Sequence, residues 1–433
     1  MAEIFPFRAW RYSPRYPLSA LVTQPYDKIT PAMQERYYAA SPYNLVRIIL
    51  GKAEPGDNEN RSVYTRAAEN FAAWRKAGVL RQDEQPSIYF YSQLFTRRGE
   101  ETTPHERRGF IALGRLYDYG EKVVFRHEQT LAKPKADRLN LLRATRAHFG
   151  QIFMLYGDPG QKVEAQFAGS ISSPPDACVR DEYGVEHRLW QVSEAATIAA
   201  VQKLMADKSL IIADGHHRYE TALAYRDERR QGQPPQSCAP YEKVMMTFIN
   251  MDSPGLLILP THRVIGGIGA ARISAMMESA RNFFSITKLA GADPSHALEK
   301  LGTTGKEQNA LVVVTRDGLY VLNAIPQKIQ AALASLSPAQ RSLDVNLLHK
   351  LLLERGLGLS EDSIRNQEHI SYYRDADEAA AQVREGKADL AFLLNPVRAE
   401  QMRDVALAGE VMPQKSTDFY PKLLSGLTIY ALE

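Results

Sequence analysis

The chain has 433 residues, of which 53 are Lys or Arg and 50 are Asp or Glu, so its formal net charge near neutral pH is +3. This balance argues against strong DNA binding and against a polybasic membrane anchor, and a hydrophobic fraction of 44% excludes wholesale disorder. Two cysteines cannot build a disulfide framework, and no apolar run approaches the ~20 residues that span a bilayer. Because no signal peptide is visible, we expect a cytoplasmic protein without a membrane partner.

Strand-like and helix-like segments alternate along the chain, which predicts an α/β or mixed α+β fold. In the first half, a helix capped by Asn60 is expected to run to about Lys76, because apolar residues recur there at helical spacing. The basic segment 135–148 is expected to form another helix. The strands expected in this half lie at 45–50, 87–95, 109–119 and 151–156, with the second and third paired.

The second half repeats this rhythm. The pattern predicts helices at 194–206, 219–230, 270–282 and 342–355, and a helix–strand–helix stretch over 375–407. It predicts a buried strand at 209–213, hairpins of 244–251 with 256–259 and of 311–315 with 320–324, and a last strand at 427–432. We expect three regions, namely an N-terminal α/β region over 1–190 that contributes to the site, a core over 191–265 and a C-terminal α/β region over 266–433.

The densest group of chemically active residues is Asp214–Arg218, which joins the buried strand to an amphipathic helix. Gly215 permits a tight turn, after which the first helical N–H groups point outward and form an anion site. His216 and His217 add donors, and Arg218 can hold a phosphate with two hydrogen bonds. Asp214 can orient a histidine, hold Mg²⁺ or accept a proton. The plain alternative is that Asp214 only caps the helix.

Four weaker clusters carry further charged or hydrogen-bonding side chains. Each also has a plain interpretation, as a solvated helix start, a surface pair, a turn or a helix cap. Their members are His127, Glu128, Thr130, Lys133 and Arg138; His262 and Arg263; Asp27 and Asn44 in two Pro-Tyr turns; and Lys415 with Ser416. The sequence has no P-loop, Rossmann or nucleophile-elbow motif, and adjacent histidines make a poor zinc pair.

Taken in chain order, these clusters resemble the bacterial and archaeal domain-of-unknown-function family number 1015, over essentially the whole chain. Lys28 departs from the family pattern, which usually has an apolar or small residue after Pro-Tyr-Asp. The Asp214–Arg218 turn is similar to the phosphate-binding turn of the ParB/sulfiredoxin-like fold, and especially to that of archaeal free-serine kinases. Those kinases hold a nucleotide's phosphates with the turn and activate the serine hydroxyl with a carboxylate. The resemblance implies a ParB/sulfiredoxin-like nucleotide-binding core over 191–265, and it carries over at Asp214–Arg218 alone.

We therefore expect a phosphotransferase that uses ATP or ADP with Mg²⁺ and acts on a small hydroxyl metabolite, with free serine as the first candidate. The alternative is a ParB-like nucleotide switch or nucleotidase without a small-molecule acceptor. The base stays open among Glu128, Asp27 and Asp214. The expected catalytic residues are Glu128, Asp214 and His217. The expected phosphate-binding residues are Gly215, His216, His217, Arg218, His262, Arg263, Lys415 and Ser416. The expected contacts to substrate or a second anion are Asp27, Asn44, His127, Thr130, Lys133 and Arg138. Mg²⁺ would bind through Asp214.

Overall fold

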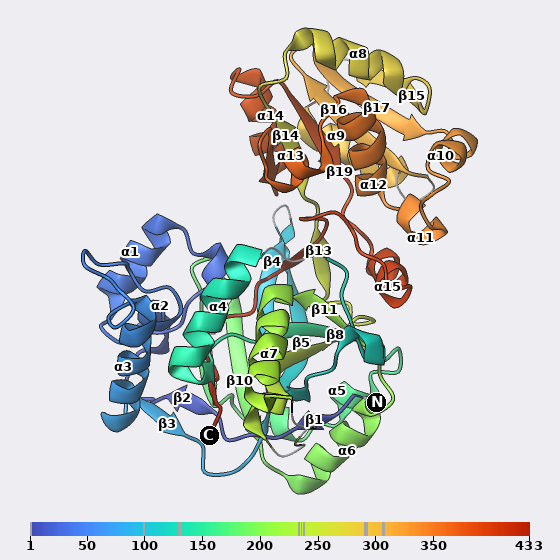
Figure 1. Ribbon diagram of the computed structural model, residues 1–433. Coiled ribbons are helices and arrows are strands. Elements are labelled where there is room, and N and C mark those ends of the chain that lie inside the picture. Colours follow the sequence, from blue (N-terminus) through green and yellow to red (C-terminus); the bar gives the residue numbers. More distant parts are fainter. Residues whose placement is uncertain are drawn as a thin grey trace. The chain divides into compact units, whose positions relative to one another are not determined.

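The computed structural model in Figure 1 describes residues 2–97, 100–128, 132–232, 234, 236, 239–289, 293–304 and 308–433. The chain forms two compact units. The first comprises Met1–Arg126, Thr130–Leu257 and Pro421–Glu433, and the second comprises His127–Gln129 and Ile258–Tyr420. Both units combine helices and strands, which confirms the mixed α/β prediction. The ParB/sulfiredoxin-like detail and the expected boundaries near residues 190 and 265 stay predictions.

The first unit is built on a mixed sheet with the strand order β6-β11-β8-β12-β5-β4-β10-β9, and β1 pairs with β5 outside this path. The first unit also contains two separate two-stranded sheets, β2–β3 and β7–β21. The strands are β1 (Ile4–Phe5), β2 (Trp10–Tyr12), β3 (Leu80–Gln82), β4 (Ile88–Arg97), β5 (Glu100–Arg115), β6 (Val124–Phe125), β7 (Ala147–His148), β8 (Ile152–Tyr156), β9 (Ala177–Arg180), β10 (Glu186–Val192), β11 (Leu210–Asp214), β12 (Lys243–Asn250) and β21 (Tyr430–Ala431).

Helices pack on this sheet through apolar side chains that meet the buried strands. β8 is buried along its whole length, as are the apolar residues of β11, and a core of Ile, Leu, Met, Phe and Tyr surrounds them. α4 packs against both α3 and α7, and α4 and α7 lie side by side in Figure 1. The helices of this unit are α1 (Pro31–Ala40), α2 (Val46–Ile49), α3 (Val63–Lys76), α4 (Ala132–Thr145), α5 (Lys162–Ala165), α6 (Ala195–Met205) and α7 (His216–Arg230), with 3₁₀ turns η1 (Leu18–Ala20), η2 (Tyr26–Lys28), η3 (Tyr119–Glu121), η4 (Ser170–Ser172) and η5 (Pro240–Glu242).

The second unit has a sheet with the order β15-β17-β16-β19-β14-β18 and a separate pair, β13–β20. Two apolar clusters, one for each face of the sheet, hold its helices. The strands are β13 (Leu257–Leu259), β14 (His262–Ile265), β15 (Phe284–Leu289), β16 (Ala310–Thr315), β17 (Gly318–Ala324), β18 (Ile370–Tyr373), β19 (Leu390–Leu394) and β20 (Asp418–Tyr420). The helices are α8 (Ala270–Ala280), α9 (Pro294–Thr304), α10 (Pro326–Ala332), α11 (Pro338–Arg341), α12 (Asp344–Leu347), the π-helix η6 (Leu348–Gly356), α13 (Glu361–Arg365), α14 (Ala376–Arg384) and α15 (Ala399–Leu407).

Most of the predicted elements are confirmed, and the exceptions have physical causes. The predicted cap at Asn60 is wrong, because Ser62 caps α3 by accepting the Thr65 N–H. The predicted strand at 45–50 is wrong, because the Asn44 side chain accepts the Val46 N–H at 2.9 Å and the segment turns into α2. A short buried apolar run suits a helix as well as a strand. The predicted hairpin of 244–251 with 256–259 is also wrong, since β12 pairs with β5 and β8 whereas β13 pairs with β20. The predicted helix over 342–355 is divided into α12 and the π-helix η6.

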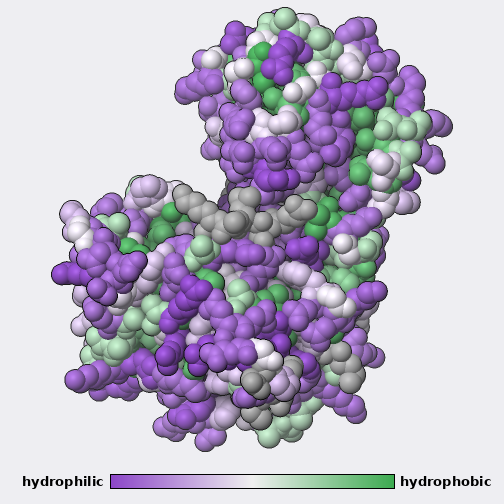
Figure 2. Space-filling model, viewed as in Figure 1, coloured by the Kyte–Doolittle hydropathy of each residue, from purple (hydrophilic) through white to green (hydrophobic). Residues whose placement is uncertain are grey.

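The surface visible in Figure 2 is mainly hydrophilic, with small hydrophobic areas separated from one another. Among the described residues, Tyr183 and Leu407 are the large hydrophobic side chains that are exposed. No described helix is long and apolar enough to cross a membrane.

Gly109→Ala is expected to destabilise the first unit strongly. Gly109 lies in β5 opposite β12, and a Cβ atom there would lie 2.2 Å from the Phe248 carbonyl oxygen. The clash falls on a paired backbone that cannot move without losing hydrogen bonds, so we expect a loss of about 1–3 kcal/mol or more in the free energy of unfolding. Denaturant unfolding of the variant measures this. Gly120→Ala, where the Cβ would enter open space, is the control, and equal stability of the two variants would contradict the prediction.

Candidate functional site

The turn between β11 and α7 forms as its sequence requires. β11 is apolar and buried until Asp214, and Gly215 then adopts φ = +96°, a left-handed conformation that glycine enters without steric cost. α7 begins directly at His216, three residues earlier than predicted, and Gly215 stands at its N-cap. No side chain caps this helix, so the alternative interpretation of Asp214 as a helix cap is wrong. The N–H groups in the first turn of a helix have no partner within the helix and point toward its end, where anions commonly bind.

Cationic side chains surround Asp214. Its Oδ2 accepts a hydrogen bond from the Lys422 ammonium at 3.0 Å, and its Oδ1 lies 3.6 Å from an Arg218 guanidinium nitrogen. Burial by itself would raise the pKa of Asp214, but the charges of Lys422, Arg218 and Lys28 outweigh burial and hold that pKa well below its usual range. A carboxylate this acidic accepts a proton poorly. The geometry thus favours Asp214 as the group that positions the cations, and disfavours it as the base.

Two glycines make room for the Arg218 side chain. The guanidinium donates a hydrogen bond to the Gln151 carbonyl oxygen. A Cβ atom on Gly150 would lie 3.3 Å from one terminal guanidinium nitrogen, and a Cβ atom on Gly215 would lie 3.0 Å from Nε. Arg218 is consequently fixed at the first turn of α7 by backbone on both sides, which preorganises its donors.

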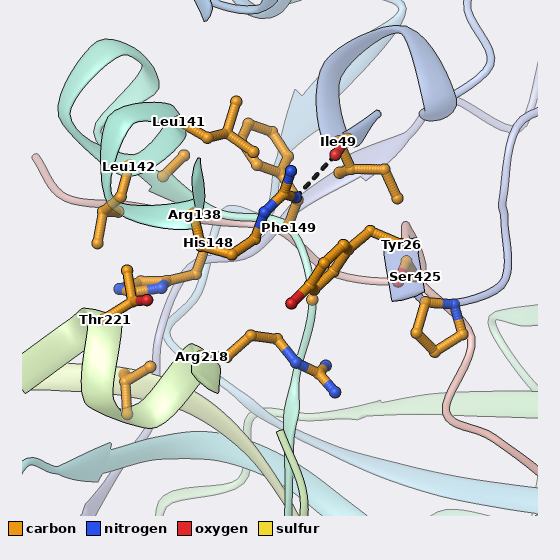
Figure 3. A pocket seen from close by; sticks show the side chains of 14 residues that line it. Tyr26, Ile49, Arg138, Leu141, Leu142, His148, Phe149, Arg218, Thr221 and Ser425 are labelled. Atoms are coloured by element: carbon orange, nitrogen blue, oxygen red, sulfur yellow. Dashed lines mark hydrogen bonds between the residues drawn. The ribbon is translucent and has the colours of Figure 1, made fainter. Parts of the chain in front are cut away.

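Arg218 also lines an open pocket of about 600 Å³ in the first unit (Figure 3). Arg138 stands at the opposite wall, donates to the Ile49 carbonyl oxygen at 2.7 Å and lies 4.0 Å from the centre of the Tyr26 ring. The Thr221 hydroxyl is buried and has no hydrogen-bond partner among the described residues. The other lining residues are Pro25, Ile49, Leu141, Leu142, Ala147, His148, Phe149, Gly150, Val244 and Ser425. The Arg138 guanidinium is also paired with Asp137, with Nε at 2.9 Å from the carboxylate. An apolar lining with the Arg218 guanidinium at its wall suits a small organic molecule that carries an anionic group.

The structure divides the predicted site residues into two groups, one in each unit. The first unit holds the Asp214–Arg218 turn and Arg138, with Asp27 in η2 beside the pocket residue Tyr26. Asn44 is fully buried and donates to the Ala20 carbonyl oxygen at 2.8 Å, so its side chain serves the turn before α2, and its role as a substrate contact stays a prediction. Thr130 and the side chain of Lys133 lie outside the described residues.

The second unit holds the remaining predicted residues around Arg263 on β14. The Arg263 guanidinium donates to the carbonyl oxygens of Thr261 and Lys415, the latter at 3.1 Å. The Lys415 N–H lies 3.5 Å from a Glu128 carboxylate oxygen. Two further contacts within this unit join His127 Nε2 to the Thr417 hydroxyl at 2.9 Å and the Ser416 hydroxyl to the Pro413 carbonyl oxygen at 2.5 Å. That the two groups act at a single site stays a prediction.

Three residues at the first group carried little signal in the sequence. Lys422 contacts Asp214 although 208 positions separate them. Lys28 acts on the same carboxylate, and the departure from the family pattern at this position thus adds a positive charge to the site. His148 lines the pocket, and burial lowers its pKa to about 4, so its ring is neutral at physiological pH. A single lysine in a polar loop, or a single histidine, gives no sign in the sequence that it will lie at this site.

Buried His262 is expected to make the protein sensitive to acid. Burial, and secondly the charge of Arg263, lower the pKa of His262 to about 4, against 6.5 for an unperturbed histidine. The unfolded chain then binds a proton across this window and the folded chain does not, so the free energy of unfolding falls as the pH falls from 6.5 to 4. The loss is on the order of 3 kcal/mol for this group.

Chemical unfolding at several pH values measures this dependence. His262→Asn, whose amide oxygen can still accept the Leu394 N–H that His262 Nδ1 accepts at 3.2 Å, is expected to make the profile less steep. His296→Asn, at an exposed position of α9, is the control. A profile unchanged by His262→Asn would show that His262 is not the group responsible.

Comparison with known proteins shows the family to which the chain belongs. Residues 4–346 match the family described as "Protein of unknown function (DUF1015)", and the chain belongs to this family, as its motifs predicted. No curated protein matches it. Similar solved structures include a conserved hypothetical protein from Pyrococcus furiosus (11% identity, TM-score 0.37, 74% of this chain and 95% of that one). Another is a free serine kinase in complex with ADP (11% identity, TM-score 0.39, 75% of this chain and 92% of that one). A third is C-terminally truncated SbnI from Staphylococcus aureus (11% identity, TM-score 0.38, 74% of this chain and 87% of that one). These values are too low to transfer an activity.

Proposed function

We propose that this chain is a nucleotide-dependent phosphotransferase that acts on the hydroxyl group of a small metabolite, with free serine as the first candidate. The observation that carries the proposal is the charge at the β11–α7 turn. Four cations, Lys28, Arg107, Arg218 and Lys422, act on the single carboxylate of Asp214. Several cations thus face one carboxylate, directly before a helix start without a capping side chain. Such a turn favours a polyanion such as a nucleotide's phosphates.

Each part of the turn has a role in this proposal. The N–H groups at Gly215–Arg218 hold the phosphates, and the Arg218 fork and His217 stabilise the charge on the phosphoryl group as it transfers. The acceptor occupies the pocket beside Arg218 and Arg138, and its anionic group must compete with Asp137 for the Arg138 guanidinium. The acceptor oxygen forms a bond to the terminal phosphorus, the bond from that phosphorus to the bridging oxygen breaks, and the hydroxyl proton passes to a carboxylate. Asp27 and Glu128 stay candidates for that carboxylate.

The described residues fit a protein-bound Mg²⁺ poorly. No group of three or more His, Cys, Asp or Glu side chains among them could hold a metal ion. The Asp214 carboxylate already faces the Lys422 ammonium and the Arg218 guanidinium. Mg²⁺ prefers several oxygen ligands, and the described residues do not offer it such a set.

A nucleotide panel tests the proposal. ATP, ADP, CTP and GTP, each with and without Mg²⁺, are compared by thermal shift and isothermal titration calorimetry. A bound nucleotide should stabilise the protein by ~2.7 kcal/mol at a hundredfold excess over its Kd. Incubation with the bound nucleotide and serine or other small alcohols, followed by ³¹P NMR, then detects a phosphorylated acceptor. No binding of any nucleotide would overturn the proposal, and hydrolysis that no acceptor alters would favour a nucleotidase.

A further inference from the structure

The second unit contains a pocket of its own beside the π-helix η6. It has an empty volume of about 780 Å³ and is open to solvent. A π-helix is rare, and where it occurs it frequently marks a functional site. η6, α11, α13, β18 and the segment 411–414 supply the walls. His349, Lys350, Ile364, Tyr372 and Met412 are among the residues that line this pocket.

His349 points to a ligand in this pocket. Its side chain lines the pocket although the residue is only 6% exposed. Its Nε2 atom is buried and has no hydrogen-bond partner among the described residues. A buried ring nitrogen without a partner costs free energy, so a native protein keeps one where a ligand or water supplies the missing partner.

Arg263 supplies a positive charge next to this pocket. It is 1% exposed, and its guanidinium carbon lies 5.5 Å from the centre of the Tyr372 ring, which lines the pocket. Its hydrogen bonds go to two backbone carbonyl oxygens, it donates to no carboxylate among the described residues, and its Nε is buried without a partner. A buried charge without a hydrogen-bonded counter-ion is costly. Arg263 and His349 also act on each other electrostatically, so the same positive field reaches the histidine.

The surrounding charges select the kind of anion. Glu128 attracts Arg263 and offsets part of its charge, which disfavours a phosphate dianion. The charged residues at the pocket wall neutralise one another, since Lys350 pairs with Glu354 at 2.8 Å and Arg365 pairs with Glu361 at 3.0 Å. Leu336, Ile364 and Met412 give the pocket an apolar wall that suits a hydrocarbon or aromatic body.

We infer that the second unit binds a small organic monocarboxylate in this pocket, with the carboxylate held by His349 in the field of Arg263. The site consists entirely of residues of the second unit, and it does not rest on the proposed phosphotransferase activity. It gives the chain a second ligand besides the one at the β11–α7 turn.

Thermal shift and isothermal titration calorimetry on the full chain, with propionate, benzoate and inorganic phosphate as probes, test this inference. The two carboxylates are expected to bind and to raise the melting temperature, and phosphate is not expected to bind in this pocket. Arg263→Met removes the buried charge. It should weaken carboxylate binding by about tenfold or more, because the attraction between the buried charge and the bound carboxylate is lost.

Three further variants keep the result interpretable. His349→Phe removes the ring nitrogens from the pocket wall and should also weaken carboxylate binding, which provides a second test if Arg263→Met fails to fold. Arg281→Met, at an exposed arginine of the same unit, should bind the carboxylates as the wild type does. Arg218→Ala should lose nucleotide binding and keep carboxylate binding, which separates this inference from the proposed function. Absence of carboxylate binding in the wild type, or unchanged binding in both Arg263→Met and His349→Phe, would overturn the inference.

Discussion

Arg218→Ala is expected to abolish the rise in melting temperature that a nucleotide causes, and to lower the rate of phosphoryl transfer on the order of 10²-fold. The reason is the position of the guanidinium, which the Gln151 carbonyl oxygen and two glycines hold at the start of α7. An alanine leaves the helix N–H groups in place but removes the guanidinium, which can donate two hydrogen bonds to one phosphate group. Arg218→Lys should also lose most of the nucleotide response, because an ammonium group keeps the positive charge but cannot donate two parallel hydrogen bonds to a phosphate.

The control for this prediction lies on the same helix. Arg229 is exposed in the last turn of α7, so Arg229→Ala removes an equal charge at the far end from the phosphate turn. Nucleotide binding is measured by calorimetry and the transfer rate by ³¹P NMR, with circular dichroism to show that the variants are folded. A nucleotide response of wild-type size in Arg218→Ala would remove the turn from the proposed mechanism.

The sequence predicted the β11–α7 turn because every signal for it is local. An apolar strand, a glycine and an amphipathic helix follow one another within Leu210–Arg230, and each element forms, with the helix starting three residues earlier than predicted. The early start of α7 at His216 follows from the same geometry, since Gly215 completes the turn and nothing then delays the first helical residue. A strand–turn–helix of this kind can be predicted from neighbouring residues, without knowing the rest of the fold.

The electrostatics of the turn could not be predicted in the same way. Lys422 reaches Asp214 because the segment after residue 420 returns to the first unit, which is a property of the whole topology. The same holds for β7 and β21, whose pairing joins Ala147 and Ala431 and brings His148 to the pocket wall. Periodicity detects which residues are buried, and it carries no signal about which distant segments meet.

The π-helix shows a second limit of sequence patterns. The segment 342–355 has the apolar spacing of a helix, and the structure does form helix there, but with π geometry over Leu348–Gly356. Met276 lies against Gly356, where a Cβ atom would be 2.7 Å from its Cγ atom. Wider turns shift which side chains share a face, and His349 then lines the pocket of the second unit. The hydrophobic pattern alone does not separate π from α geometry.

Gly215→Ala is expected to affect binding far more than its effect on stability explains. At φ = +96° an alanine is strained by roughly 1–2 kcal/mol. Its Cβ would in addition lie 3.0 Å from Arg218 Nε and 3.1 Å from the guanidinium carbon. The arginine must then move away from Asp214 and from the phosphate position. We therefore expect a modest fall in melting temperature together with a loss of nucleotide affinity of about tenfold or more, because a charge-assisted hydrogen bond is lost.

Gly184→Ala separates the effect of backbone strain from the effect of displacing Arg218. Gly184 belongs to the same unit and has a similar left-handed φ of +79°, but a Cβ atom there would meet nothing within 4 Å. This variant should show the same backbone strain by denaturant unfolding and bind nucleotide as the wild type does. The ratio of the two nucleotide affinities then measures the displacement of Arg218 alone, since backbone strain is common to both variants. Equal affinities would mean that the turn tolerates the displaced guanidinium, and the phosphate would then have to be held by other groups.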